Sequence, residues 1–310
     1  MKKALVSIAA IVLASSMVFG QDLNAVTEIY NAAAAALSNS EKESALESFE
    51  KALPLAEALG AEGADIVSQC KGIIPNLTLS IAKDLVKAAN FDGAIEKLNA
   101  AKEKAEKFEA ADILDEIGTL LPQVLLSKGN SLLTAKDYAG AAAVYKDILA
   151  ADETNGMAAL RLGQALNAAG DAQGAIDAFT KAAANGQEAN ANKQLSNINL
   201  KVAAAALKEK KFADAVASAL KANEFGENPQ AYQIAAQASQ LSGKNNDAIK
   251  YFEKYLEIAP TAKNAGQIAY TVGALYQQVK NVAKAKEFYT KALSDPKYGA
   301  EAKKLLDALK

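Results

Sequence analysis

The chain has 310 residues with 34 basic and 36 acidic side chains, and it contains no histidine, no tryptophan, one cysteine and one arginine. Without histidine there is no histidine-based catalytic triad or histidine metal ligand, and one cysteine makes neither an intramolecular disulfide nor a thiolate metal cluster. Few glycines, prolines and aromatics beside abundant alanine, leucine, lysine and glutamate favour helix over strand. We therefore expect an all-α protein, and we assign no catalytic, cofactor-binding or metal-binding residues.

The first twenty residues have the pattern of an export signal. Lys2 and Lys3 precede an apolar run from residue 4 to residue 19, and small residues stand at its end. Positive charge, an apolar run and a small-residue cleavage site are typical of a secretory signal peptide. We expect cleavage near Gly20 and Gln21, and a periplasmic or secreted mature chain. The other interpretation is a retained membrane anchor.

The mature chain is mildly acidic. Removal of residues 1–20 takes out two lysines and no acid, so the side-chain charge becomes 32 − 36 = −4. Nucleic acid is not an expected partner, because its binding needs a basic face. No later apolar run reaches the length of a membrane span. We expect Cys70 to be a small buried apolar residue; the alternative is a redox-active or intermolecular thiol.

A pattern of small and aromatic residues recurs along the chain. Gly163 is followed twelve residues later by an alanine, then by Phe179 and Ala182, and Gly273 is followed in the same way by an alanine and Tyr289. Weaker copies occur elsewhere. The anchoring alanines, one in each copy, are separated by 49, 47, 34, 40, 33 and 37 residues and are Ala45, Ala94, Ala141, Ala175, Ala215, Ala248 and Ala285.

This spacing and pattern resemble the tetratricopeptide repeat, a pair of antiparallel helices in about 34 residues. The resemblance covers residues 24–296 and is most specific around Ala175 and Ala285. The tryptophan of the family pattern is absent, and Pro260 stands in its closing proline position. The resemblance implies a right-handed α-solenoid of about seven antiparallel helix hairpins with a C-terminal capping helix.

The repeat spacing also suggests how the chain is divided. The first two spacings are long, which predicts extended helices in the N-terminal part. The last segment places Ala302, Leu305 and Leu309 on one helical face, as a cap over the last repeat requires, although a partner-binding helix has the same pattern. The predicted ranges are a signal peptide over 1–20, extended hairpins over 21–118, a regular array over 119–298 and the cap over 299–310.

A single helix hairpin buries too little surface to be stable alone, so the hairpins must stack. Small residues are needed where helices approach closely. We expect Gly129, Gly163 and Gly273 on first helices to face the anchoring alanines, and the aromatic residue four positions after each alanine to fill the gap between hairpins. Asn155-Gly156 and Asn185-Gly186 are predicted to break the chain between repeats.

The resemblance also implies that the first helices line a groove for an extended peptide or a partner helix. Counting back from the anchoring alanines by 18, 11 and 8 residues finds amides in most repeats, and four glutamines share one helical stripe. Amides both donate and accept, so they suit a peptide backbone. These candidate groove residues, the amide columns, are Gln123, Asn130, Gln164, Asn167, Asn197, Gln230, Gln233, Gln237, Gln240, Gln267 and Gln277.

The amide columns also have simpler interpretations. A polar stripe is the ordinary solvated side of an amphipathic helix. Pro75, Pro122 and Pro229 each precede a column position and are expected at helix starts, where the following amide only solvates the terminus. Some members of the family clamp a terminal carboxylate, but Arg161, Asn130 and Lys201, the candidates in adjacent repeats, do not reproduce that clamp.

The sequence therefore predicts a non-enzymatic scaffold of the cell envelope that binds a protein or an extended peptide. The alternative is a small-solute or glycan-binding protein, with Tyr232, Tyr251, Tyr270 and Tyr276 as aromatic platforms. A third interpretation, an enzyme, needs a deep pocket with perturbed carboxylates. No phosphate-binding glycine motif is present.

Overall fold

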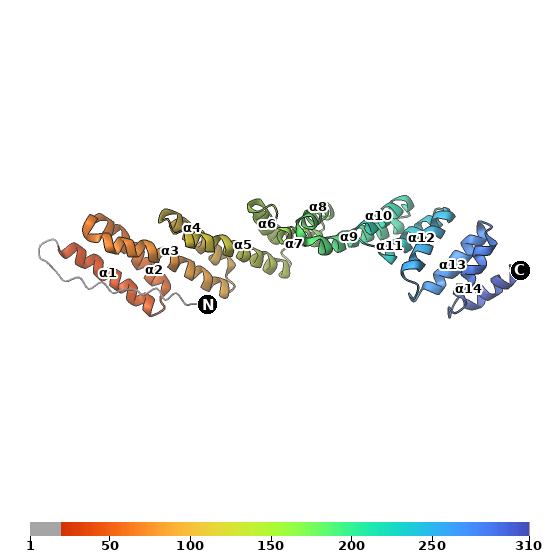
Figure 1. Ribbon diagram of the computed structural model, residues 1–310, viewed down its shortest axis with the longest axis horizontal. Helices are drawn as coiled ribbons and strands as arrows, with labels where there is room; N and C mark the ends of the chain where they lie inside the picture. Colours follow the sequence, from red (N-terminus) through yellow and green to blue (C-terminus); the bar gives the residue numbers. More distant parts are fainter. Residues whose placement is uncertain (1–19, 310) are drawn as a thin grey trace. The chain divides into compact units, whose positions relative to one another are not determined.

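The computed structural model describes residues 20–309, which form helices and contain no strand (Figure 1). The all-α prediction is confirmed. The predicted signal peptide lies outside the described residues as far as Phe19, and Gly20 is the first residue of helix α1. Within residues 20–309, no helix combines the length and the apolar character that crossing a bilayer requires.

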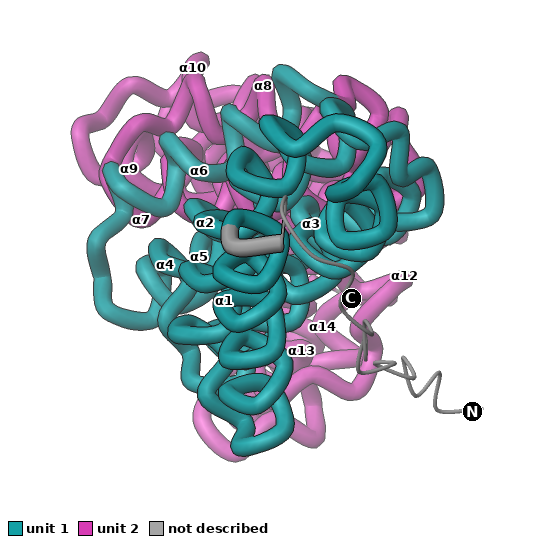
Figure 2. The backbone as a smooth tube through the Cα atoms, turned by 90° about the vertical axis from the view of Figure 1, so that its left-hand side faces the viewer, with its two compact units in different colours: residues 1–151 teal, residues 152–310 magenta. Residues whose placement is uncertain are grey.

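The helices form two compact units, residues 1–151 and residues 152–310 (Figure 2). The division that the sequence suggested at residue 118 lies inside α5, whereas unit 1 ends at Ala151. Unit 1 holds three antiparallel hairpins, formed by α1 (Gly20–Ser38) with α2 (Lys42–Ala58), α3 (Ala64–Lys87) with α4 (Phe91–Lys107), and α5 (Ala111–Thr134) with α6 (Tyr138–Ala151).

Unit 2 holds four hairpins and a final helix that caps the last of them. Helix α15 packs on α14, with Ala302 in the core. A π-helical turn precedes α9, and the backbone of Asn185 and Gly186 leaves helical geometry there, as the Asn-Gly pair predicted. The helices are α7 (Gly156–Ala169) with α8 (Ala172–Ala182), α9 (Glu188–Lys208) with α10 (Phe212–Glu224), α11 (Pro229–Leu241) with α12 (Asn245–Ile258), α13 (Ala265–Gln278) with α14 (Val282–Ala292), and α15 (Gly299–Ala308).

All seven anchoring alanines have no exposed surface, so the small residues that define the repeat lie where helices pack. The partners of the glycines differ from the expectation. A Cβ on Gly163 would lie 2.6 Å from the ring of Phe179, and one on Gly273 would lie 2.7 Å from the ring of Tyr289. Gly129 approaches Tyr145 in the same way. Each glycine therefore makes room for the aromatic ring of its own hairpin, one turn beyond the anchoring alanine.

The predicted helix starts at Pro75 and Pro122 are wrong, because both prolines lie inside 24-residue helices. Helix α3 begins eleven residues before Pro75, at Ala64. Ile66, Cys70 and Ile74 lie one turn apart in that extension and are buried in a core shared with α1 and α2. Their burial outweighs the loss of one backbone hydrogen bond at the proline. Cys70 is thus a core residue, and burial raises the pKa of its thiol to about 11.

The turn inside each hairpin has the same backbone form in all seven. The residue five positions before the anchoring alanine adopts positive φ. The N–H group of the following residue donates a hydrogen bond to the carbonyl five residues earlier, as Lys211 does to Ala206 at 2.9 Å. This closure satisfies the end of the first helix. Only two of the seven positive-φ residues are glycines: the set is Ser40, Ala89, Lys136, Gly170, Lys210, Gly243 and Lys280.

The two units differ in how their charges pair. In unit 1, five ion pairs join different helices, in addition to three pairs within a helix. The five are Lys42 with Asp84, Glu57 with Lys71, Glu50 with Lys104, Lys83 with Glu116, and Asp92 with Lys128. The ammonium groups of Lys42 and Lys87 hold the pKa of Asp84 below its usual range. In the described part of unit 2, every ion pair joins residues at most four positions apart. Among the residues that the structure describes, ion pairs therefore bridge different helices in unit 1 and not in unit 2.

The contact between Gly163 and Phe179 leads to a prediction. We expect Gly163→Ala to lower the free energy of unfolding by about 1–3 kcal/mol, because the added methyl group meets a buried ring. Gly72→Ala is the control: it lies inside α3 with open space around the new Cβ, so helix propensity should stabilise it by about 0.5–1 kcal/mol. Urea unfolding of both variants measures the two changes. If both substitutions changed the free energy of unfolding in the same direction, the close approach of Gly163 to Phe179 would be contradicted.

The shared turn leads to a second prediction. Lys210 has a φ of 61°, where a side chain is strained. We expect Lys210→Gly to raise the free energy of unfolding by about 0.5–1 kcal/mol, because relief of that strain exceeds the entropy that glycine adds to the unfolded chain. Lys208→Gly, on the last residue of α9, should instead be destabilising. Thermal unfolding followed by circular dichroism compares the stability of the two variants. A loss of stability in Lys210→Gly would contradict the strain that we assign to Lys210.

Candidate binding site

The amide columns lie on the first helices of their hairpins. Gln123 and Asn130 belong to α5 in unit 1, and the other nine belong to α7, α9, α11 and α13 in unit 2. Four of the nine, Gln233, Gln237 and Gln240 of α11 and Gln267 of α13, line a single pocket of about 150 Å³. We call this the amide pocket. Its remaining lining residues are Phe252, Asn264, Ile268 and Thr271.

Two adjacent first helices build the amide pocket. Helix α11 starts at Pro229, and the side chain of Asn228 caps it by accepting the N–H of Gln230 at 2.9 Å. From that fixed start, the three glutamines follow at intervals of four and three residues, which places them on one face. The facing wall of α13 carries Gln267 and Thr271, one turn apart. Gln233 and Gln237 are half-buried and Gln240 is exposed.

The pocket presents amides without hydrogen-bond partners in the folded chain. Asn264 accepts the hydroxyl of Tyr255, and the hydroxyl of Thr271 donates to the carbonyl of Gln267 at 3.0 Å. The side chains of Gln233, Gln237 and Gln240 form no hydrogen bond to another part of residues 20–309. None of the lining side chains ionises at neutral pH. The pocket therefore offers neutral donors and acceptors to a ligand.

Other members of the amide columns have a partner inside the chain. Asn130 accepts the hydroxyl of Tyr145 at 2.9 Å, and Gln277 accepts the hydroxyl of Tyr289 at 2.8 Å. Both tyrosines are fully buried, and a buried phenol needs an acceptor. Burial also raises the pKa of Tyr289. These two amides hold core tyrosines, a role that the spacing did not predict.

The remaining column positions do not gather at one place. Arg161 donates to Gln164 at 3.0 Å, and Asn167 follows one turn later on α7. Asn197 and Gln230 are exposed on α9 and α11. Gln123 is exposed in the middle of α5, so solvation of a helix start does not explain it. Asn130 also lines an open polar depression with Phe91, Ser127, Ser131 and Thr134.

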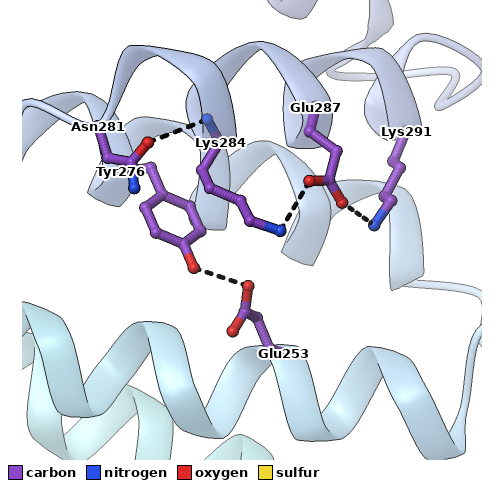
Figure 3. A network of polar contacts seen from close by, with 6 residues as sticks. All are labelled: Glu253, Tyr276, Asn281, Lys284, Glu287 and Lys291. Carbon is purple, nitrogen blue, oxygen red and sulfur yellow. Dashed lines mark hydrogen bonds and ion pairs between the residues drawn. The ribbon is translucent and has the colours of Figure 1, made fainter.

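The tyrosines considered as glycan platforms are used in packing. Tyr270 stacks on Tyr298 with ring centroids 5.1 Å apart, and Tyr276 stacks on Phe288 at 5.7 Å. The hydroxyl of Tyr276 donates to Glu253 at 2.8 Å (Figure 3). Burial, with the bond to Glu253, raises the pKa of Tyr276 to about 12. The ring faces that a sugar would need are therefore partly covered.

A larger cavity, which the sequence did not predict, lies between α12 and α14. It has a volume of about 770 Å³ and is lined by both helices and by the turns that follow them. Its lining includes charged side chains, in contrast to that of the amide pocket. Within the described residues, no group of three or more carboxylate or thiol side chains is placed to hold a metal ion.

Comparison with known proteins identifies the repeat. A family model described as a tetratricopeptide repeat matches residues 229–261 and 266–294. The first match covers the hairpin α11–α12 and the second covers α13–α14, so the amide pocket lies within matched repeats. The comparison with curated proteins gave no match.

Solved structures similar to the chain include MamA, with 21% identity, a TM-score of 0.34 and coverage of 56% of this chain and 96% of MamA. YrrB, described as a TPR protein with an unusual peptide-binding site, has 22% identity, a TM-score of 0.34 and coverage of 58% and 91%. The TPR2AB domain of yeast Sti1, solved as a complex with pHSP90, has 17% identity, a TM-score of 0.32 and coverage of 77% and 97%.

The family match and the internal repetition agree. Seven hairpins share one turn conformation, and each buries an anchoring alanine completely. The two hairpins that match the family model have the same turn and the same buried alanine as the five that do not. Hairpins α11–α12 and α13–α14 are therefore tetratricopeptide repeats, and the other five hairpins share their turn and their buried alanine.

Proposed function

We propose that the protein is a non-enzymatic interaction module that binds an extended segment of a partner protein at the amide pocket. The supporting observation is the set of three glutamines on α11 whose side chains have no partner within residues 20–309 and face Gln267 and Thr271 of α13. Two neighbouring repeats hold them, so the donors and acceptors are positioned before a ligand arrives. Such preorganisation lowers the entropy lost on binding.

The chemistry of the pocket suits a peptide backbone. A glutamine side chain carries a carbonyl acceptor and two N–H donors, which match the N–H and C=O groups of an extended chain. Phe252 and Ile268, both nearly fully buried, supply an apolar base for a small side chain. Because the lining is uncharged, binding should depend weakly on ionic strength.

A small-molecule ligand is less favoured by the dimensions of this pocket. Its volume of about 150 Å³ is below the roughly 300–1,000 Å³ of cavities that enclose drug-sized ligands. A short stretch of a longer chain fills such a pocket without being enclosed by it. The stacking of Tyr270 and Tyr276 on other rings also removes support from the glycan alternative.

The location of the partner rests on the sequence alone. Two lysines, an apolar run and a small-residue site at the start of the chain support export after cleavage near Gly20. We therefore place the partner in the cell envelope or outside the cell. Detection of a mature chain beginning at Gln21 by mass spectrometry tests this placement, and a full-length chain in the membrane fraction would contradict it.

The amide pocket leads to a binding prediction. Peptides selected from a phage-displayed random library on the purified chain should bind the combined variant Gln233→Ala, Gln237→Ala and Gln240→Ala more weakly. Each lost hydrogen bond is worth about 0.5–1.5 kcal/mol, so the dissociation constant should rise about tenfold or more. Fluorescence anisotropy of the labelled peptides measures the change.

A matched control variant distinguishes the effect of losing the pocket amides from the effect of losing any three surface amides. The variant Gln173→Ala, Asn190→Ala and Asn246→Ala removes three exposed amides of unit 2 that do not line the pocket. It should bind the selected peptides as the unmodified chain does. The assignment of the pocket would be wrong if both variants weakened binding equally, or if the first left it unchanged.

A further inference from the structure

The groove between α12 and α14, with its volume of about 770 Å³, has the size of a ligand site. Leu256 of α12, Ala265 and Ala269 of α13, and Phe288 of α14 give it an apolar lining. Glu253 and Glu257 line it from α12, and Lys284, Glu287 and Lys291 line it from α14. Lysine and arginine side chains suit such a surface, because their aliphatic stems pack on apolar groups while their charged ends stay among polar groups.

Most of the charges in this groove already have partners. Lys284 and Lys291 both donate to Glu287 at 2.8 Å (Figure 3). Lys291 also lies 4.2 Å from the centre of the Phe288 ring. Glu257 pairs with Lys254 at 2.7 Å. Asp295, in the turn after α14, accepts the N–H groups of residues 297 and 298.

Glu253 differs from these lysines and glutamates in its lack of an ion-pair partner among the described residues. Its carboxylate accepts the hydroxyl of Tyr276 and forms no ion pair within the described residues. Figure 3 shows the ammonium group of Lys284 bonded to Glu287. That bond raises the pKa of Lys284, and the charge of Glu253 also contributes, but Lys284 and Glu253 form no ion pair. Lys263, the other cation that lines the groove, is exposed on the linker between α12 and α13. A half-buried carboxylate thus lies in the groove with a single hydrogen bond.

In unit 1, a lysine side chain lies beside the glutamate that is equivalent to Glu253. Glu50 lies five residues after its anchoring alanine, as Glu253 does, and it pairs with Lys104 across the space between α2 and α4. Lys104 also donates to Thr78 of α3 at 3.2 Å. A lysine side chain therefore occupies this position between the second helices of adjacent hairpins.

The corresponding lysine is missing from unit 2. Counted from the anchoring alanine of its hairpin, Asp295 has the position of Lys104, and Ala269 has the position of Thr78. Both Asp295 and Ala269 line the groove. Helix α4 continues to Lys107, whereas α14 ends at Ala292, so no helical residue of α14 reaches across. The cation is replaced by an acid, and the hydroxyl is replaced by a methyl group that leaves more room.

We propose that the groove between α12 and α14 binds a lysine or arginine side chain of a partner protein segment, with its cation against Glu253. The incoming side chain takes the place that Lys104 occupies in unit 1. Its aliphatic stem lies on Leu256, and an apolar neighbour in the segment covers Ala265. This site uses charge and lies on other helices than the three glutamines of the amide pocket, so the two proposals succeed or fail separately.

The first experiment titrates the full mature chain with N-acetyl-arginine amide and with its neutral isostere, N-acetyl-citrulline amide. Methyl NMR of alanine-labelled protein reads out Ala262, Ala265 and Ala269, which line the groove. We expect saturable shifts with the arginine probe and none with citrulline. Equal shifts with both probes, or shifts with neither, would overturn the proposal.

The variant Glu253→Gln tests the carboxylate directly. The glutamine still accepts the hydroxyl of Tyr276 but carries no charge, and an unchanged alanine methyl spectrum confirms its fold. We expect the arginine probe to bind about tenfold more weakly. Glu224→Gln, an exposed carboxylate at the end of α10 outside the groove, is the matched control and should bind normally. Unchanged affinity in Glu253→Gln would refute the role of Glu253.

A peptide distinguishes a protein segment from a free cationic solute. A short peptide with one arginine between leucines should bind more tightly than the single amino acid, because its apolar side chains cover the groove. The same peptide with citrulline in place of arginine should lose that affinity. Binding of the amino acid without binding of the peptide would show a small-solute site and overturn the proposal.

Discussion

The fold depends on the close approach of two helices within each hairpin. Ala175 and Ala285 have no exposed surface, and Gly163 and Gly273 lie directly against the rings of Phe179 and Tyr289. A glycine under a ring lets a large apolar group be buried without separating the helices, which combines dense packing with a short interaxial distance. Because the turn has the same closure in every hairpin, this geometry recurs along the chain and sets the spacing of side chains on the first helices.

Burial of tyrosines at this contact divides the polar residues of the first helices into two groups. A tyrosine in the ring position brings a hydroxyl into the core, and Asn130 or Gln277 then serves as its acceptor. Phe252 brings no hydroxyl, so the neighbouring glutamines of α11 keep their donors and acceptors for other partners. Next to Phe252, the free glutamines of α11 meet Gln267 and Thr271 of α13, and a neutral pocket results.

The pairing of charges decides which spaces between helices stay open. In unit 1, lysines such as Lys104 and Lys128 reach carboxylates on other helices. In the described part of unit 2, lysines pair with acids at most four residues away, as Lys284 and Lys291 do with Glu287. Such local pairs contribute little to stability, and they leave the space between α12 and α14 unbridged.

The sequence by itself determined the helical class, the repeat and the anchoring alanines, because a recurring pattern of small and aromatic residues reports a packing contact made in every copy. It also predicted Gln233, Gln237, Gln240 and Gln267 as residues of a binding face, and the structure brings them together in one pocket.

The tertiary structure alone decided which amides hold tyrosines, since that depends on which hydroxyl each buried ring brings near them. It also decided that α3 and α5 run through Pro75 and Pro122, because buried side chains before each proline, such as Cys70 and Ile117, outweigh the local preference for a helix start. The groove beside Glu253 could not be predicted, because it arises where α14 ends too early to bridge it.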